Sequence, residues 1–157
     1  MNKAQHLYDY LIKTGLVMEE ELDVWVEEGE VISTPVFDGS PNLVYEDRYQ
    51  INGFIQNFPI AQRDLRKVKF ALLWWVNLYQ PERDKTAFGW EANNLNAETT
   101  NVWFGIAVTE KTRLKDGVIS TCIQPLLMQN TDLSAIPVWL HDIRSGEEAL
   151  VKDKLDG

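Results

Sequence analysis

The sequence predicts an α+β fold, in which an antiparallel or mixed sheet of about four or five strands carries a long amphipathic helix and an N-terminal helix. Three patterns lead to this class. Apolar residues recur at helical spacing over residues 60–79, and they alternate with polar residues over 43–58. Over 102–109 both parities are apolar, which is typical of a strand in the middle of a sheet with a cover on each face.

Two segments are predicted to be helical. Residues 4–14 have apolar side chains at helical spacing, and Gly15 follows as a C-cap. Residues 60–79 have a wider apolar stripe, which indicates a helix covered from two directions, and Pro81 ends it.

The first half of the sheet is predicted from two segments. Residues 24–32 read as a hairpin whose turn takes a positive φ at Gly29. Residues 43–58 read as one strand with a buried and a wet face, which ends at Pro59. On this strand Asp47 interrupts the apolar face, and Gly53 marks a bulge or a close approach.

The second half of the sheet follows the long helix. Residues 86–100 read as a strand and then a polar loop, and residues 102–109 as the central strand. Asp116-Gly117 is a hairpin turn, and 118–123 returns as the partner strand.

The chain of 157 residues suits a single domain, which we place at residues 1–125. Residues 126–157 are then a C-terminal extension, either a hairpin or an interaction arm, with a helix from Gly146 onward as the alternative.

The net charge of −9 and the pI near 4.7 argue against direct binding of nucleic acid, which needs clustered cations. The basic cluster over 63–69 contains Asp64 and reads as a solvated helix face. The longest wholly apolar run, 70–76, is far below the roughly 20 residues that span a membrane. The N-terminus lacks the apolar region and cleavage site of a secretory leader, so secretion by that route is not expected. We therefore expect a soluble protein that is cytosolic where it is made.

Residues typical of catalytic or metal sites are sparse. His6 and His141 have no ligand residues at metal-site spacing, and Cys122 is the sole cysteine. The acidic runs 19–23 and 27–30 read as solvated turns. Asp47 is expected to bond a tyrosine, a backbone amide or a neighbouring subunit. We predict no catalytic residues, no metal and no cofactor.

Several short motifs follow one another in a fixed order along the chain. Their positions are Trp25 and Gly29 in the first strand pair, Tyr45 and Tyr49 in the next strand, Trp75, Gln80 and Pro81 at the helix end, and Thr109 and Glu110 after the central strand. Taken in this order, they resemble the tail completion protein R (GpR) family of contractile-tailed bacteriophages. The similarity spans about residues 4–125, and nothing after residue 125 matches the family.

This resemblance implies a structural virion protein that acts without chemistry. Such a protein completes or terminates the tail at its head-proximal end and prepares the tail to join the head. The related terminators form six-fold rings, so the implied partners are further copies in a hexameric ring, tube and sheath proteins, and head-side connector proteins, but neither nucleic acid nor membrane. The implied location is the host cytoplasm during assembly of a phage or prophage tail, and then the virion tail.

Three aromatic residues in polar or loop regions are candidates for the interfaces of such an assembly: Phe37, Trp90 and Trp139. Two other classes of function stay open at this point. One is a small acidic hydrolase or isomerase that uses carboxylates, which would need a pocket where they converge. The other is an acidic protein that binds a basic partner, which would lose affinity steeply with salt.

Overall fold

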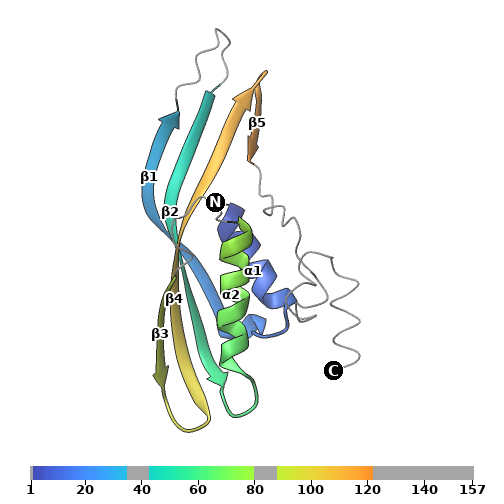
Figure 1. Cartoon of the computed structure of the whole chain (residues 1–157), viewed down its shortest axis with the longest axis vertical. Helices are drawn as coiled ribbons and strands as arrows, with labels where there is room; N and C mark the ends of the chain where they lie inside the picture. The colour runs from blue at the N-terminus through green and yellow to red at the C-terminus, as the bar shows by residue number, and fades with distance from the viewer. Residues whose placement is uncertain (1, 35–42, 80–87, 122–157) are drawn as a thin grey trace.

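The computed structural model describes residues 2–34, 43–79 and 88–121, which form one curled antiparallel sheet with two helices on one of its faces (Figure 1). The elements in chain order are α1 (Asn2–Lys13), a 3-10 turn (Glu19–Glu21), β1 (Leu22–Thr34), β2 (Leu43–Pro59), α2 (Leu65–Tyr79), β3 (Gly89–Asn94), β4 (Thr99–Lys115) and β5 (Val118–Thr121). The predicted α+β class with an antiparallel sheet is confirmed.

The sheet is built around β2 and β4, which pair with each other over almost their whole length. β1 lies on the far side of β2, and β3 lies on the far side of β4. β5 pairs with the other end of the same edge of β4, so β3 and β5 share that edge without overlapping. The predicted central position of the 102–109 segment is therefore correct.

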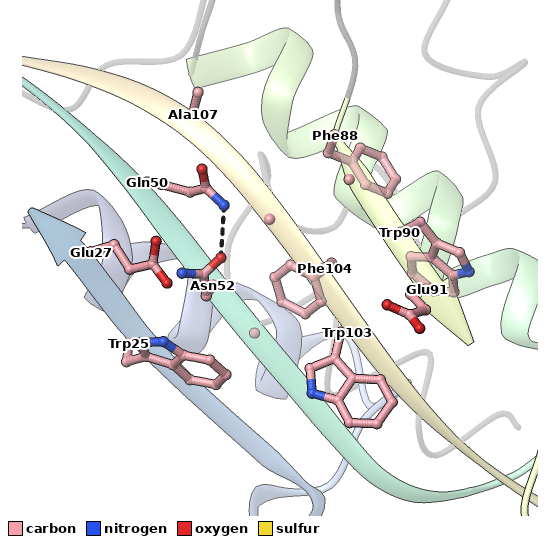
Figure 2. Close-up of a pocket in the computed structure, with 13 residues that line it drawn as sticks. Trp25, Glu27, Gln50, Asn52, Phe88, Trp90, Glu91, Trp103, Phe104 and Ala107 are labelled. Carbon is pink, nitrogen blue, oxygen red and sulfur yellow. Dashed lines mark hydrogen bonds between the residues drawn. The ribbon is translucent and has the colours of Figure 1, made fainter. Parts of the chain in front are cut away.

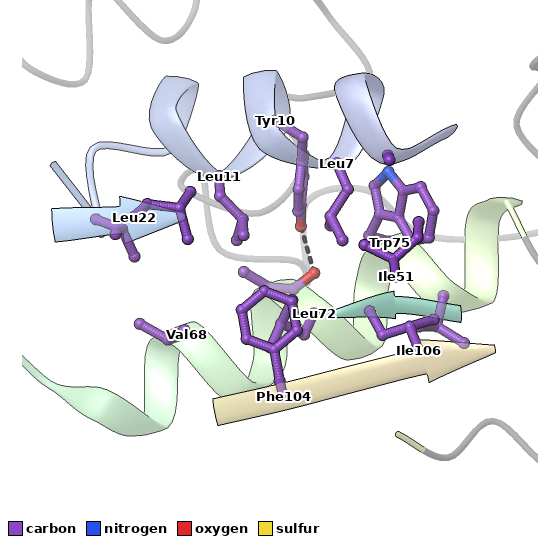
Figure 3. Packing of buried hydrophobic residues seen from close by; sticks show 14 of the residues in the cluster. Leu7, Tyr10, Leu11, Leu22, Ile51, Val68, Leu72, Trp75, Phe104 and Ile106 are labelled. Carbon is purple, nitrogen blue, oxygen red and sulfur yellow. Dashed lines mark hydrogen bonds between the residues drawn. The ribbon is translucent and has the colours of Figure 1, made fainter. Parts of the chain in front are cut away.

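The hydrophobic core lies between the helices and one face of the sheet (Figure 3). Alternate residues of β4 point into it, and Val102, Phe104 and Ile106 are almost fully buried. Gly53 on β2 faces Phe104, and a Cβ atom at this position would lie 1.9 Å from the ring. The close approach predicted for Gly53 is thus confirmed, since only glycine leaves room for that ring.

The helix ends agree with local chemistry. α1 is followed by Gly15, whose φ is 72° and whose N–H donates to the carbonyl of Ile12, as the predicted C-cap requires. α2 begins at Leu65 instead of residue 60, because Asp64 acts as its N-cap and accepts from the N–H of Arg66 at 3.0 Å.

The hairpin predicted over residues 24–32 is wrong. These residues are one continuous strand, β1, which pairs with β2 on both sides of a bulge between Glu27 and Glu30. Gly29 lies in this bulge and does not have the positive φ that a turn would need; a Cβ there would lie 1.5 Å from the carbonyl oxygen of Arg48. The glycine is therefore required by the tight contact with β2 and not by a turn.

The polar loop predicted after residue 90 begins too early. β3 continues to Asn94, and the turn that follows is organised by Asn96, whose Oδ1 accepts from the N–H groups of Glu98 and Thr99. The turn before β5 is confirmed, with positive φ at Asp116 and Gly117.

The predicted cover on both faces of β4 is present on one face only among the described residues. The second face carries Trp103, which is 38% exposed, together with the exposed Ala107. The sheet also extends past both helices, so that β1, β2, β4 and β5 form a projection, the distal arm, made of residues 30–34, 43–48 and 111–121 (Figure 1).

Candidate interaction surfaces

The uncovered side of the sheet is the first candidate surface. By strand register, Trp25 on β1, Phe54 on β2 and Trp103 on β4 share this side, which points away from the helices. The rings of Phe54 and Trp103 pack with their centroids 4.7 Å apart. We call this side the open face; it comprises Asp23, Trp25, Glu27, Gln50, Asn52, Phe54, Glu91, Trp103, Gly105 and Ala107.

A shallow depression of about 640 Å³ crosses the middle of the open face (Figure 2). Its floor is an amide pair, in which Gln50 Nε2 donates to Asn52 Oδ1 at 2.9 Å. Asn52 Nδ2 is buried and has no hydrogen-bond partner among the residues that the structure describes. A Cβ atom on Gly105 would come within 2.7 Å of Gln50 Nε2, so the glycine leaves room for this amide beside β4.

The charge of the depression is negative. Glu27 and Glu91 line it, and none of its lining residues is Lys or Arg. Trp25 and Trp103 stand beside these carboxylates and are 43% and 38% exposed. Exposed aromatic faces beside carboxylates favour contact with a group that carries positive charge.

The second candidate surface lies on the outer side of α2. Residues three and four apart on a helix share a face, and this one, the helix stripe, consists of Arg66, Lys67, Phe70, Leu73, Trp74 and Asn77. Phe70 is 57% exposed, and Leu73 and Trp74 are half-buried. Trp74 Nε1 is buried without a hydrogen-bond partner in the described part of the chain.

The helix stripe is basic at its N-terminal end. Residues 64–70 contain three cations, Arg66, Lys67 and Lys69, against one carboxylate, Asp64. The hydrogen bonds from Arg66 lower the pKa of Asp64, which therefore remains ionised. Lys69 Nζ lies 5.1 Å from the centroid of the Trp90 ring.

The third candidate surface is the distal arm, where several large apolar side chains are exposed. The register places Val31, Leu43, Tyr45 and Ile119 on one side of the arm, the side that carries the helices lower down. All four are exposed, Ile119 by 74%. An apolar patch of this kind marks a contact surface more often than an isolated exposed residue does.

Glu110 ties β4 to the start of α1. Its Oε1 accepts from the N–H of Asn2 at 3.1 Å, and its Oε2 accepts from the N–H of Lys3 and from the hydroxyl of Tyr49. A carboxylate here satisfies free N–H groups of the first helical turn and interacts favourably with the helix dipole. Burial, followed by the bond to Glu110, raises the pKa of Tyr49, so its hydroxyl stays protonated and donates.

Lys3 completes this junction. Its Nζ donates to the carbonyl oxygen of Tyr79 at 2.9 Å and to that of Thr109 at 2.6 Å, so that α1, α2 and β4 meet at one side chain.

Asp47 lies opposite Glu110 in the register of β2 and β4. Tyr49 is the next residue on the same side of β2, and its hydroxyl donates to Glu110. A hydrogen bond to a tyrosine was one of the roles expected for Asp47. For Tyr49 this role is taken by Glu110.

His6 and Trp75 form a second polar contact at the edge of the core. Trp75 Nε1 donates to His6 Nδ1 at 2.9 Å, and the His6 ring packs edge-on against Tyr79. Burial lowers the pKa of His6 below its usual 6.5, with a smaller opposing effect from Asp9. The imidazole is therefore neutral in the fold, as an acceptor at Nδ1 must be.

We expect the stability of the protein to fall as the pH is lowered from about 7.5 to about 5.5. Because the pKa of His6 is depressed in the fold, the unfolded chain binds the proton first, so this contribution is complete above pH 6.5 and is lost below it. Urea unfolding across this range measures the slope. His6→Gln removes the titrating group and should flatten it; an unchanged slope in that variant would assign the pH dependence to other groups.

The motif positions fall into distinct places in the fold. Trp25 is on the open face, Gly29 is in the β1 bulge and Tyr45 is on the distal arm. The structure brings Tyr49, Thr109 and Glu110 together at the α1 junction, whereas Trp75 is buried in the core. Gln80 and Pro81 lie outside the described residues.

Of the three interface candidates, Phe37 and Trp139 lie outside the described residues. Trp90 is half-buried and packs edge-on against Phe88, with ring centroids 6.1 Å apart. Phe54, Phe70 and Trp103 were not singled out by sequence reasoning. In the 102–109 strand the alternate residues that face away from the core are also apolar, and this pattern could have pointed to Trp103.

Metal-binding clusters and membrane-spanning helices are not seen in the described residues. They contain no cluster of His, Cys, Asp and Glu side chains that would hold a metal ion. Within the same ranges, neither helix has the length and apolar character needed to cross a membrane.

Comparison with known proteins identifies the family. The family model for the P2 phage tail completion protein R (GpR) matches residues 1–122, more than three quarters of the chain. No curated protein and no solved structure matches the chain. The family is one of structural phage tail proteins and is not a known enzyme family. The chain therefore belongs to the P2 phage tail completion protein R (GpR) family and is a structural component of a phage tail.

Proposed function

We propose that this protein terminates the tail at its head-proximal end and prepares it to join the head, by protein–protein contacts and without chemistry. The observation that carries the proposal is the family match over residues 1–122, which includes every helix and strand that the structure describes. Membership in a tail completion family implies contacts with other tail components. The proposal places those contacts at the head-proximal end of the tail.

The partners in this proposal are further copies of the chain in a hexameric ring, the tube and sheath proteins of a contractile tail, and the connector proteins of the head. Two features support an assembly of several chains. The distal arm exposes Val31, Leu43, Tyr45 and Ile119 together, and the open face exposes Trp25 and Trp103. In a lone copy this apolar area stays in water, and association would remove it from water.

Residues 1–125 form the assembling domain in this proposal, and residues 126–157 are an interaction arm that binds a neighbouring subunit. Sequence reasoning placed the boundary there, and the family match ends close to it, at residue 122.

Electron microscopy of tails tests the proposed function. Tails from a deletion of the coding sequence should be overlong or uncapped and should fail to join heads, and added purified protein should restore normal tails. A version that lacks residues 130–157 should restore them poorly if the extension binds a neighbour. Tails of normal length that join heads in the deletion would overturn the terminator role.

A further inference from the structure

Two surfaces on opposite sides of the described fold are exposed, although the apolar pattern of the sequence predicts that both are buried. The wide apolar stripe over residues 60–79 indicates a helix covered from two directions, yet Phe70 is 57% exposed on the outer side of α2. The alternate residues of β4 that lie on the open face are also apolar, which indicates a cover there, yet Trp103 is exposed. Because both helices pack on one side of the sheet, the helix stripe and the open face point in roughly opposite directions.

The two surfaces are complementary in charge. The depression in the open face is lined by Glu27 and Glu91, with no Lys or Arg in its lining. The N-terminal half of the helix stripe carries Arg66 and Lys67 beside the exposed ring of Phe70. Contact between them would pair opposite charges around an aromatic centre, which is the usual composition of a specific interface.

Each surface also contains a buried polar atom that has no partner among the described residues. On the open face it is the amide nitrogen Asn52 Nδ2, and on the helix stripe it is the indole nitrogen Trp74 Nε1. A buried donor left unpaired is destabilising. An acceptor brought by a neighbouring copy would remove this cost.

We propose that the helix stripe of one copy docks on the open face of the next copy. Phe70 of the first copy lies between Trp25 and Trp103 of the second, while Arg66 and Lys67 face the two carboxylates of the depression. This inference rests on the proposed assembly into a ring and names the surfaces that make the subunit contact.

Such a contact is heterologous, because it joins two unlike patches of the same chain. Repeated head-to-tail contacts form a closed ring when the rotation between subunits closes, and a filament when it does not. The sheet-on-helix arrangement leaves the distal arm outside the contact, free to bind other tail proteins.

Two variants, each with one surface disabled, test the contact. The open-face variant is Trp25→Ala with Trp103→Ala, and the stripe variant is Phe70→Glu with Lys67→Glu. All four side chains are exposed, so both variants should fold. Leu95→Ser is the matched control, since Leu95 is an exposed apolar residue in the β3–β4 turn, away from both surfaces.

Masses in solution, from light scattering or native mass spectrometry, give the readout. The wild-type chain and the control should associate, and each disabled variant alone should remain monomeric, with an affinity weakened roughly tenfold or more. Mixed together, the two variants should form a dimer of about 36 kDa, twice the 18.1 kDa of the chain, because one functional stripe meets one functional open face and growth then stops. The contact would be overturned by any of three results: a disabled variant that associates to the wild-type mass, a mixture of the two variants that forms no dimer, or a wild-type chain that stays monomeric.

The tail assay separates this inference from the proposed function. If both disabled variants restore normal tails to the deletion, the contact between stripe and open face is wrong while the terminator role stands. If the wild-type protein itself fails to restore tails, the terminator role is wrong whatever the solution masses are.

Discussion

Trp75→Ala is expected to lower the free energy of unfolding by about 3–5 kcal/mol, the usual cost of truncating a large buried aromatic side chain. Trp75 is fully buried between α2, α1 and the sheet (Figure 3). Its removal leaves a cavity and frees His6 Nδ1 from the indole N–H. Chemical denaturation monitored by circular dichroism measures the change.

The neighbouring tryptophan provides the control. Trp74→Phe should change stability by less than about 0.5 kcal/mol or raise it slightly, because it removes a buried N–H that has no partner among the described residues. Trp75→Phe should cost about 1 kcal/mol or more through the lost bond to His6. Equal losses for Trp74→Phe and Trp75→Phe would contradict the roles given to the two indoles.

Glu110→Ala is expected to cost about 3 kcal/mol, because several donors lose their acceptor at once. These are the N–H groups of Asn2 and Lys3 and the hydroxyl of Tyr49. The loss should be local, so that amide hydrogen exchange in α1 speeds up more than exchange in β2 or β4.

Conservative variants at the same junction give an ordered series. Glu110→Gln keeps one oxygen acceptor and should lose less than Glu110→Ala. Tyr49→Phe removes a single hydroxyl and should cost about 1 kcal/mol. A Glu110→Ala protein with wild-type stability, or with faster exchange spread evenly over the fold, would show that the junction does not hold α1 to the sheet.

Sequence patterns predicted the helices, strands and turns of this fold well where a segment fitted only one kind of element. The alternation over 43–58 gave β2, and Asp116-Gly117 gave the turn before β5. The pattern failed at Gly29, where acidic residues and a glycine read as a turn. In the fold, pairing with β2 on both sides keeps the strand extended, and the extra residues are absorbed as a bulge.

The candidate surfaces were harder to predict because they depend on contacts between distant parts of the chain. Glu110 and the N–H of Asn2 are 108 positions apart, so no spacing rule brings them together. The open face also depends on register, since Trp25, Phe54 and Trp103 share one side only when three strands are aligned. The apolar residues on the second side of β4 were the one local sign that this side would be covered.

The length of β2 and β4 has a mechanical consequence. Each strand has 17 residues, and at about 3.3 Å per residue the pair runs for roughly 55 Å, from the end that packs against the helices to the tip of the distal arm. Their hydrogen bonds lie across the strand direction, so a pull on one of the two strands along the arm loads all the hydrogen bonds between them together, in shear. Force applied at the tip therefore reaches the core through one continuous ladder, and the arm transmits load instead of peeling away rung by rung.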